Sequence, residues 1–445
     1  MTILIKILQL ILALGILIII HEFGHFFFAR IFGIKVDKFF LFFDAGGVKL
    51  FSTRSGWFTR LFPKAAQWET EYGIGWLPLG GYCKIAGMID ESMDTEQLEG
   101  EAQPWEFRSK PAWQRLFVMA GGVLFNFIFA FIMYIAILST WGESYISNEG
   151  KQIYVNELAY DMGFRNGDHI ISFDDYYPEN FSMLQADLAR EMADKTTILR
   201  DGDTLDIYID HNRIGDVLEN PGMFDLAMPF IIRSVADNSP NRETGLHEGD
   251  HIIGIDSIRT EFVQDAWPVL EDYAGRSVSA EIVRSGDTLS MTLQVDTTGR
   301  LGIWLTPIET VRKDYTLISA IPAGIKRTFS TIGGYLKDLK LVATPSTEAY
   351  KSVGSFIAIG QIFPATWNWQ SFLNIIALLS VMLGVMNLIP IPALDGGHIL
   401  FTLYEMTTGK KPSDRFLYIM QIIGMILLMG LMFLAFGNDI ARLIG

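Results

Sequence analysis

Four long runs of apolar residues dominate the hydropathy pattern and predict membrane-spanning helices. They cover residues 3–34, 116–141, 372–391 and 416–436. Each run is long enough to cross the hydrocarbon core of a bilayer as a helix. The first run continues past a polar interruption and has no small-residue cleavage site, so we expect a retained helix and not a signal peptide.

Between the first two runs, short apolar stretches predict a small sheet. The candidate strands are 39–43, 47–51, 72–76 and 80–85. A Leu-Pro-Leu connection and paired glycines separate the last two and favour a β-hairpin. Such strands can dip into the bilayer where their backbone groups are paired, and an ordinary cytosolic hairpin fits the pattern equally well. The acidic stretch 90–101 predicts a flexible loop.

An internal repeat organises the polar middle of the chain. The motif G-x-x-x-G-D-H-I-I that begins at Gly163 recurs at Gly245, and R-x-G-D-T-L at Arg200 recurs at Arg284. Spacings of 82 and 84 residues indicate two copies of one β-rich domain, with a boundary near 220–222.

After the repeats, apolar positions recur at helical spacing from residue 315 to 342, with basic residues between them. The pattern predicts one or two amphipathic helices at the membrane interface, or helices packed against the repeat domains. Lys and Arg gather in 30–115 and 398–415, so we place these two segments on the cytoplasmic side. The repeat region and both termini are then expected outside.

Composition supports a partly membrane-embedded chain. Half of the 445 residues are hydrophobic, with 32 Phe and 18 Met. The net charge of −15 is concentrated in residues 142–310, which hold 12 Lys and Arg against 31 Asp and Glu. The sequence contains no basic stripe of the kind that would indicate a nucleic-acid partner. Cys83 is the only cysteine, which excludes an intramolecular disulfide.

The first apolar run contains an H-E-x-x-H motif at His21, Glu22 and His25. Residues four apart share one face of a helix, so both imidazoles can point at one metal ion. Two imidazoles suit Zn²⁺, and the adjacent carboxylate suits a general base for a water molecule activated by the ion. The alternative is an amphipathic helix whose histidines only cap or pack. Polar groups within so apolar a run are costly unless they face a protein interior or a cavity, which favours the metal site.

An acidic residue, Asp395, lies at the break that ends the third apolar run. Catalytic zinc commonly takes two His and one carboxylate, and the expected topology brings Asp395 to the depth of His21 and His25. A helix-capping role is the alternative for Asp395. His398 follows the break, where we favour a structural or supporting role.

These residues resemble the signature of the site-2 protease family of intramembrane zinc metalloproteases, H-E-x-x-H with N-x-x-P-x-P-x-L-D-G. The second motif here begins at Asn387 and ends at Gly396. The two repeats resemble PDZ domains, and their place between the motifs is similar to the bacterial RseP-type branch. Similar stretches at 74–82 and 120–127 extend the resemblance over nearly the whole chain. That branch often has Gly-Pro before the third span, where this chain has Gly354-Ser355.

The resemblance implies an endopeptidase that cuts single-pass membrane proteins within or near their spanning helix, after an upstream site-1-type protease has removed the outer domain. Anti-sigma factors and remnant signal peptides are the implied substrates, and the lipid of the bacterial inner membrane is the implied surroundings. The hairpin with Gly75 and Gly80 would pair with an unwound substrate, and Asn387 would hold its backbone. The PDZ domains would act as a size filter on the periplasmic side.

Two other function classes stay open. A metal transporter or sensor would use His and Asp as a transit site, but it predicts such residues spread along all the spans. A non-catalytic PDZ scaffold tethered to the membrane explains the repeats and leaves Glu22 without a role.

We therefore predict an α-helical polytopic membrane protein with four transmembrane helices, a membrane-associated β-hairpin or sheet and two inserted β-rich PDZ domains. The expected segments are a first span over 1–36, a cytoplasmic-side β region over 37–115, a second span over 116–141, repeat domains over 142–222 and 223–310, amphipathic helices over 311–350, a third span over 351–398, a cytoplasmic turn over 399–415, and a fourth span with the C-terminus over 416–445.

Overall fold

The computed structural model describes residues 2–78, 80–88 and 101–444 and forms two compact units. The first unit joins Met1–Glu143, Asp314–Lys340 and Lys351–Gly445, and the second joins Ser144–Lys313 and Leu341–Tyr350. The acidic stretch 90–101, expected to be a loop, lies outside the described residues except for its last position.

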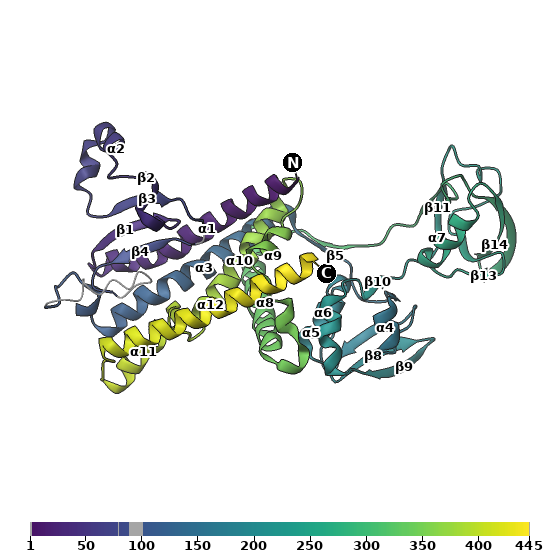
Figure 1. Ribbon diagram of the computed structural model, residues 1–445. Helices are drawn as coiled ribbons and strands as arrows, with labels where there is room; N and C mark the ends of the chain where they lie inside the picture. Colours follow the sequence, from purple (N-terminus) through teal and green to yellow (C-terminus); the bar gives the residue numbers. More distant parts are fainter. Residues whose placement is uncertain (1, 79, 89–100, 445) are drawn as a thin grey trace. The chain divides into compact units, whose positions relative to one another are not determined.

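Each of the four apolar runs is a helix of the first unit (Figure 1). These helices are α1 (Thr2–Ile31), α3 (Ala112–Trp141), α10 (Trp369–Leu388) and α12 (Asp414–Ile444). All four are long and apolar enough to cross a membrane. Many of their large apolar side chains are exposed, as expected for helices that face lipid.

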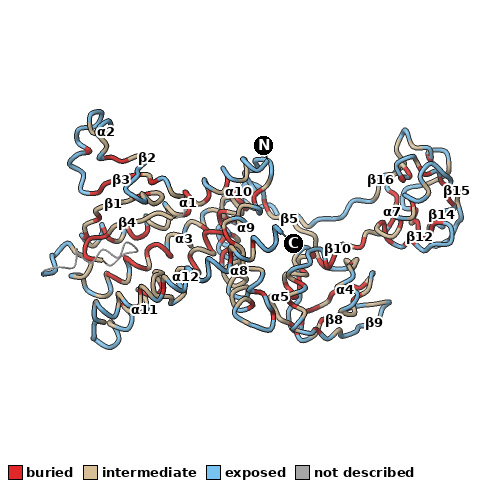
Figure 2. The backbone as a smooth tube through the Cα atoms, in the orientation of Figure 1, coloured by how far each residue is buried: buried red, intermediate tan, exposed pale blue. Residues whose placement is uncertain are grey.

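The helix α3 packs against both α1 and α10 and forms the centre of the first unit. Ala13 and Leu17 of α1 pack with Phe372 and Ile376 of α10, and Tyr134 of α3 joins a second cluster. Buried residues are accordingly frequent along α3 and α10, whereas most residues of α12 are intermediate or exposed (Figure 2). Packed helices of this kind hold polar side chains at fixed positions inside an apolar bundle.

A four-stranded sheet follows α1, in the order β2-β3-β1-β4. Its strands are β1 (Val36–Leu41), β2 (Lys49–Ser52), β3 (Glu71–Gly75) and β4 (Tyr82–Ile85). The expected hairpin is wrong in its pairing, because β3 and β4 do not pair with each other: β1 lies between them, parallel to β3 and antiparallel to β4. Phe40 of β1 is fully buried, so an apolar central strand displaces the pairing that the short connection suggests.

Four further helices differ from the sequence-based expectation or add to it. The expected cytoplasmic turn is the helix α11 (Asp395–Thr408). The amphipathic region is a single helix, α8 (Leu317–Ala343), whose Ile332 and Tyr335 pack on the cluster of α3 and α10. The remaining short helices of the first unit are α2 (Gly56–Leu61) and α9 (Phe356–Gln361).

The second unit contains both sequence repeats, each with its own apolar core. The first repeat holds β5 (Glu143–Tyr145), β6 (Ile153–Val155), α4 (Glu157–Asp161), β7 (His169–Phe173), α5 (Leu184–Glu191), β8 (Lys195–Arg200), β9 (Asp203–Tyr208), α6 (Ile214–Glu219) and β10 (Phe224–Leu226). Because β10 pairs with β6, the first repeat extends past the boundary expected near 220–222. The second holds β11 (Ile232–Val235), β12 (His251–Ile255), β13 (Ile258–Arg259), α7 (Val263–Asp272), β14 (Ser277–Arg284), β15 (Asp287–Gln294) and β16 (Ile303–Leu305). The strand β17 (Val311–Lys313) follows it and pairs with β5.

An ion pair explains why the two repeat motifs recur together. In the first copy, Arg200 donates from Nε and Nη2 to the two carboxylate oxygens of Asp168, at 2.7 Å each. In the second copy, Arg284 makes the same pair of bonds to Asp250, at 2.6 and 2.7 Å. Each arginine also donates to the carbonyl of the first motif glycine. The arginine of one motif therefore neutralises the buried aspartate of the other.

Candidate active site

Three ligand-type side chains converge where α1 meets the start of α11. His21 and His25 lie one turn apart on α1, and Asp395 is the first residue of α11. The Nε2 atoms of the two histidines are 3.3 Å apart, and each lies 3.4 Å from Oδ2 of Asp395. All three side chains are at most 12% exposed. Oδ2 of Asp395 is buried and accepts no hydrogen bond from the described residues.

This triangle has the dimensions of a zinc site. Donor atoms bound about 2.0–2.2 Å from one Zn²⁺ at tetrahedral angles lie roughly 3.3–3.6 Å apart. The three measured separations of 3.3, 3.4 and 3.4 Å fall within this range. Two imidazoles and one carboxylate also leave the fourth tetrahedral position open, as catalytic zinc requires.

The outer nitrogens of both imidazoles have partners on α3. Nδ1 of His25 lies 2.9 Å from the carbonyl oxygen of Val118, so it carries a hydrogen and leaves the Nε2 lone pair for a metal. Nδ1 of His21 lies 3.1 Å from the side-chain amide of Asn126. The Oδ1 atom of Asn126 is buried and has no partner among the described residues, and turning the amide by a half-turn lets it accept from Nδ1 of His21. Both Nε2 atoms are then free to bind metal.

Asn126 is a site residue that the sequence analysis did not identify. It is fully buried near the middle of α3. An amide inside an otherwise apolar span is costly unless it has a partner, so its position was the available signal. The partner could not be named before the contact between α1 and α3 was known.

Two close approaches of the backbone bring α3 to the histidines. A Cβ atom on Gly24, inside the H-E-x-x-H motif, would lie 2.2 Å from the carbonyl oxygen of Gly121. A Cβ atom on Gly122 would lie 2.5 Å from Nε2 of His25 and 2.6 Å from Cε1 of His21. Glycine at these positions therefore permits the helix contact that supports the imidazoles.

The segment before Asp395 is strained, and the helix α11 that follows it is anchored to α3. The helix α10 ends at Leu388, and Ala393 adopts a φ of 84°, which is unusual for a residue with a side chain. Further along α11, Glu405 accepts a 2.5 Å hydrogen bond from Arg115 of α3. This ion pair anchors α11 to α3 and thereby contributes to the position of Asp395.

A cavity of about 680 Å³ opens beside the three ligands. Glu22 lines it together with His21, His25, Asp395 and His398. The opposite walls come from β4 and from α12, whose contributing residues are Gln421, Met425, Leu428, Met429 and Met432. The cavity therefore combines a few polar, ligand-type groups with apolar side chains, as is typical of binding sites.

The three residues expected to contact substrate lie elsewhere in the first unit. Asn387 is half-buried near the end of α10, and Gly75 ends the inner strand β3. Gly80 lies just before β4, where an added Cβ atom would lie 2.6 Å from the ring of Phe43. Among the described residues, none of these three lines the cavity, whereas the neighbouring Gly81 does.

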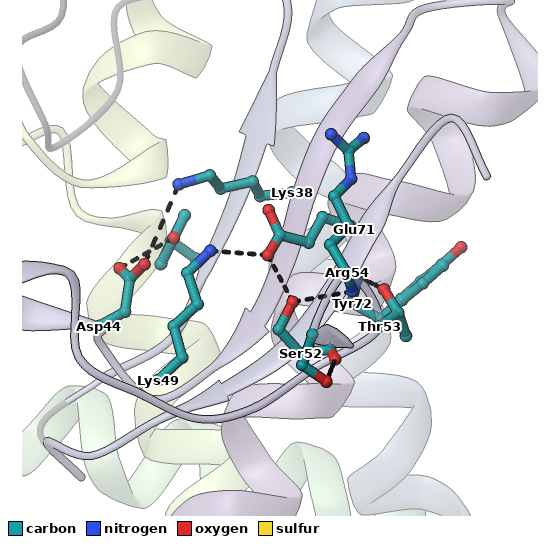
Figure 3. Close-up of polar contacts among 10 residues, drawn as sticks. Lys38, Asp44, Lys49, Ser52, Thr53, Arg54, Glu71 and Tyr72 are labelled. Carbon is teal, nitrogen blue, oxygen red and sulfur yellow. Dashed lines mark hydrogen bonds and ion pairs between the residues drawn. The ribbon is translucent and has the colours of Figure 1, made fainter. Parts of the chain in front are cut away.

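Charged groups hold the sheet together beside this cavity (Figure 3). Glu71 accepts hydrogen bonds from Nζ of Lys49 at 2.7 Å and from Oγ of Ser52 at 2.6 Å. Burial works to raise the pKa of Glu71, but these two donors outweigh it and lower the pKa. Lys38 and Asp44, which line the cavity, form a second pair at 4.0 Å.

Comparison with known proteins identifies relatives across the full length of the chain. The sequence profile of peptidase family M50 matches residues 9–431. The regulator of sigma-E protease RseP of Salmonella typhimurium is 29% identical, over 97% of this chain and 98% of the relative. RseP of Escherichia coli strain K12 has the same identity and coverage. A putative zinc metalloprotease of Xylella fastidiosa is 28% identical, over 97% of both chains.

Proposed function

The chain belongs to peptidase family M50 as a zinc metalloprotease of the site-2 type, and on this basis we propose that it cuts the membrane-spanning segments of single-pass proteins in an active site formed by His21, Glu22, His25 and Asp395. One observation carries the assignment of the site. Three buried donor atoms from α1 and α11 form a triangle with the dimensions of a tetrahedral zinc site.

In this proposal His21, His25 and Asp395 hold zinc, which supplies Lewis-acid activation of water and of the scissile carbonyl. Glu22 takes the proton from the attacking water and delivers it to the leaving amine. Val118 and Asn126 fix the orientation of the imidazoles. The buried setting keeps bulk water away and strengthens each of these electrostatic contacts.

The substrate has to be extended before it can be cut, because a helix conceals its carbonyls in its own hydrogen bonds. We assign recognition of the unwound segment to β4, which is the terminal strand of its sheet and lines the cavity. Main-chain groups along the outer edge of such a strand can pair with an added peptide strand. Gly80 and Gly75 support this role by allowing the close packing around β4 and β3, and Asn387 is proposed to hold the substrate backbone.

The names of the relatives suggest the biological setting. Two of them are named regulator of sigma-E protease, so we propose anti-sigma factors as substrates, with remnant signal peptides as a second class. An upstream protease of the site-1 type would prepare these substrates. The protein is an integral membrane protein, and we propose the bacterial inner membrane, with the two repeats as periplasmic PDZ domains that restrict access by size.

The test uses the full chain in proteoliposomes with zinc and a single-pass substrate. Glu22→Gln is expected to retain zinc and to lose roughly 10²–10⁴-fold in cleavage rate. The exposed Glu157→Gln on α4 is the matched control and is expected to cleave normally. Cleavage by Glu22→Gln at the normal rate contradicts the role of Glu22. Zinc flux without cleavage supports a transporter, and neither activity in the unaltered chain supports a scaffold.

A further inference from the structure

The segment from Val48 to Trp68 presents an apolar face that no part of the described chain covers. Leu50, Trp57 and Leu61 are 69%, 59% and 66% exposed. Figure 1 shows α2, at the centre of this segment, well away from α12 and at the outer end of the sheet. We call this segment the α2 surface.

The aromatic rings of the α2 surface are assembled on one another and not on a core. Phe58 contacts the rings of Phe51, Trp57, Phe62 and Trp68, with centroid separations of 4.9–6.5 Å. Only Ala65 among the residues of α2 and the turn that follows it is buried. The face is therefore preformed, and burying it would release a large apolar area from water.

The charge of the same segment has one sign. Residues 48–68 contain four Lys and Arg and no Asp or Glu. Lys49 pairs with Glu71 of the sheet, but Arg54, Arg60 and Lys64 form no ion pair with any described residue. In Figure 3 the guanidinium of Arg54 extends away from the polar cluster around Glu71. Three cations thus remain available to an anionic partner.

We propose that the α2 surface docks on the anionic surface of the lipid bilayer that holds the spanning helices, an inference that rests on the membrane placement in the proposed function. Tryptophan and large aliphatic side chains partition into the interfacial layer, while Arg and Lys reach lipid phosphates. Each cation near an anionic leaflet strengthens the association by about fivefold. Since β2 is part of this segment, docking would hold the sheet, including the cavity strand β4, at a fixed depth.

The docking is tested with a nitroxide label on the full-length chain in bilayers, a readout independent of proteolysis. Cys83→Ser provides the background, and the label is attached at Leu61→Cys. Bilayers contain either phosphatidylcholine alone or phosphatidylcholine with phosphatidylglycerol. A label at Trp267→Cys, on the similarly exposed Trp267 of α7, serves as the control that is expected to stay in water.

The proposal predicts that the label at position 61 is accessible to oxygen and protected from a water-soluble nickel reagent when phosphatidylglycerol is present. The triple variant Arg54→Gln, Arg60→Gln, Lys64→Gln should weaken this protection by about a hundredfold in the docking equilibrium. The variant Lys410→Gln, Lys411→Gln removes exposed cations from another loop and should have little effect. Protection independent of lipid charge, or water exposure equal to position 267, overturns the proposal. Protection from both reagents would indicate a covering protein and also overturns it.

Discussion

Replacing Asn126 by leucine tests whether α3 tunes the metal site through His21. The side chain of Asn126 is fully buried and lies 3.1 Å from Nδ1 of His21. Leucine has a similar volume, so the span should still pack, but His21 loses the partner that fixes its ring and its tautomer. Loss of such a partner typically costs 10–100-fold in metal affinity, equivalent to about 1.4–2.7 kcal/mol. We expect zinc affinity to fall by this factor, with a parallel loss of cleavage at limiting zinc.

Competition with a chromophoric chelator at fixed pH measures this affinity, because protons compete with metal for the ligands. Ser380→Ala is the matched control, since it removes a buried 2.8 Å bond to the backbone oxygen of the same Asn126 without reaching His21. Asn126→Asp retains an acceptor for Nδ1–H and should bind zinc better than Asn126→Leu. If Asn126→Leu binds zinc as tightly as the unaltered chain, the orienting role of Asn126 is refuted.

Three further changes test other parts of the account. Gly122→Ala places a methyl group 2.5 Å from Nε2 of His25, so we expect at least tenfold weaker zinc binding, while Gly437→Ala, with open space around it, should bind normally. Ser355→Pro removes the N–H that donates to Asp439 at 2.8 Å, and we expect a loss of roughly 1–3 kcal/mol in unfolding free energy, read against the conservative Ser355→Ala. The Arg284 hydrogen bonds lower the pKa of Asp250, so this contribution to stability is complete above the unfolded pKa of about 4 and is lost as pH falls through the folded value. Asp250→Asn should therefore increase hydrogen exchange in β14 and β15 at neutral pH, and lowering the pH should change this exchange less than in the unaltered chain. An unchanged pH dependence of the exchange would contradict the pairing of Arg284 with Asp250.

The sequence predicted much of this molecule because its strongest signals are local. The four apolar runs and the i, i+4 spacing of His21 and His25 depend on one helix at a time. The position of β1 between β3 and β4 could not be predicted, because strand order depends on contacts between distant segments. The same limit applies to Asn126, whose partner lies 105 residues away, and to the helix α11, whose anchoring ion pair joins Arg115 to Glu405.

The resemblance implied a Gly-Pro pair before the third span, where this chain has Gly354-Ser355. Ser355 is the N-cap of α9 and donates from both N–H and Oγ to Asp439 of α12. Proline could not make the first of these bonds. This chain therefore ties the end of α12 to α9 with an interaction that only a non-proline residue allows.

The most direct test of the central claim is X-ray absorption spectroscopy of zinc in the purified full-length chain. The account predicts one zinc with two imidazole nitrogens and one carboxylate oxygen at about 2.0–2.2 Å, plus a further light ligand. Glu22→Gln should keep this spectrum, and Asp395→Ala should lose the bound zinc or change its shell. A spectrum with fewer than two imidazoles, or one unaffected by Asp395→Ala, would contradict the account.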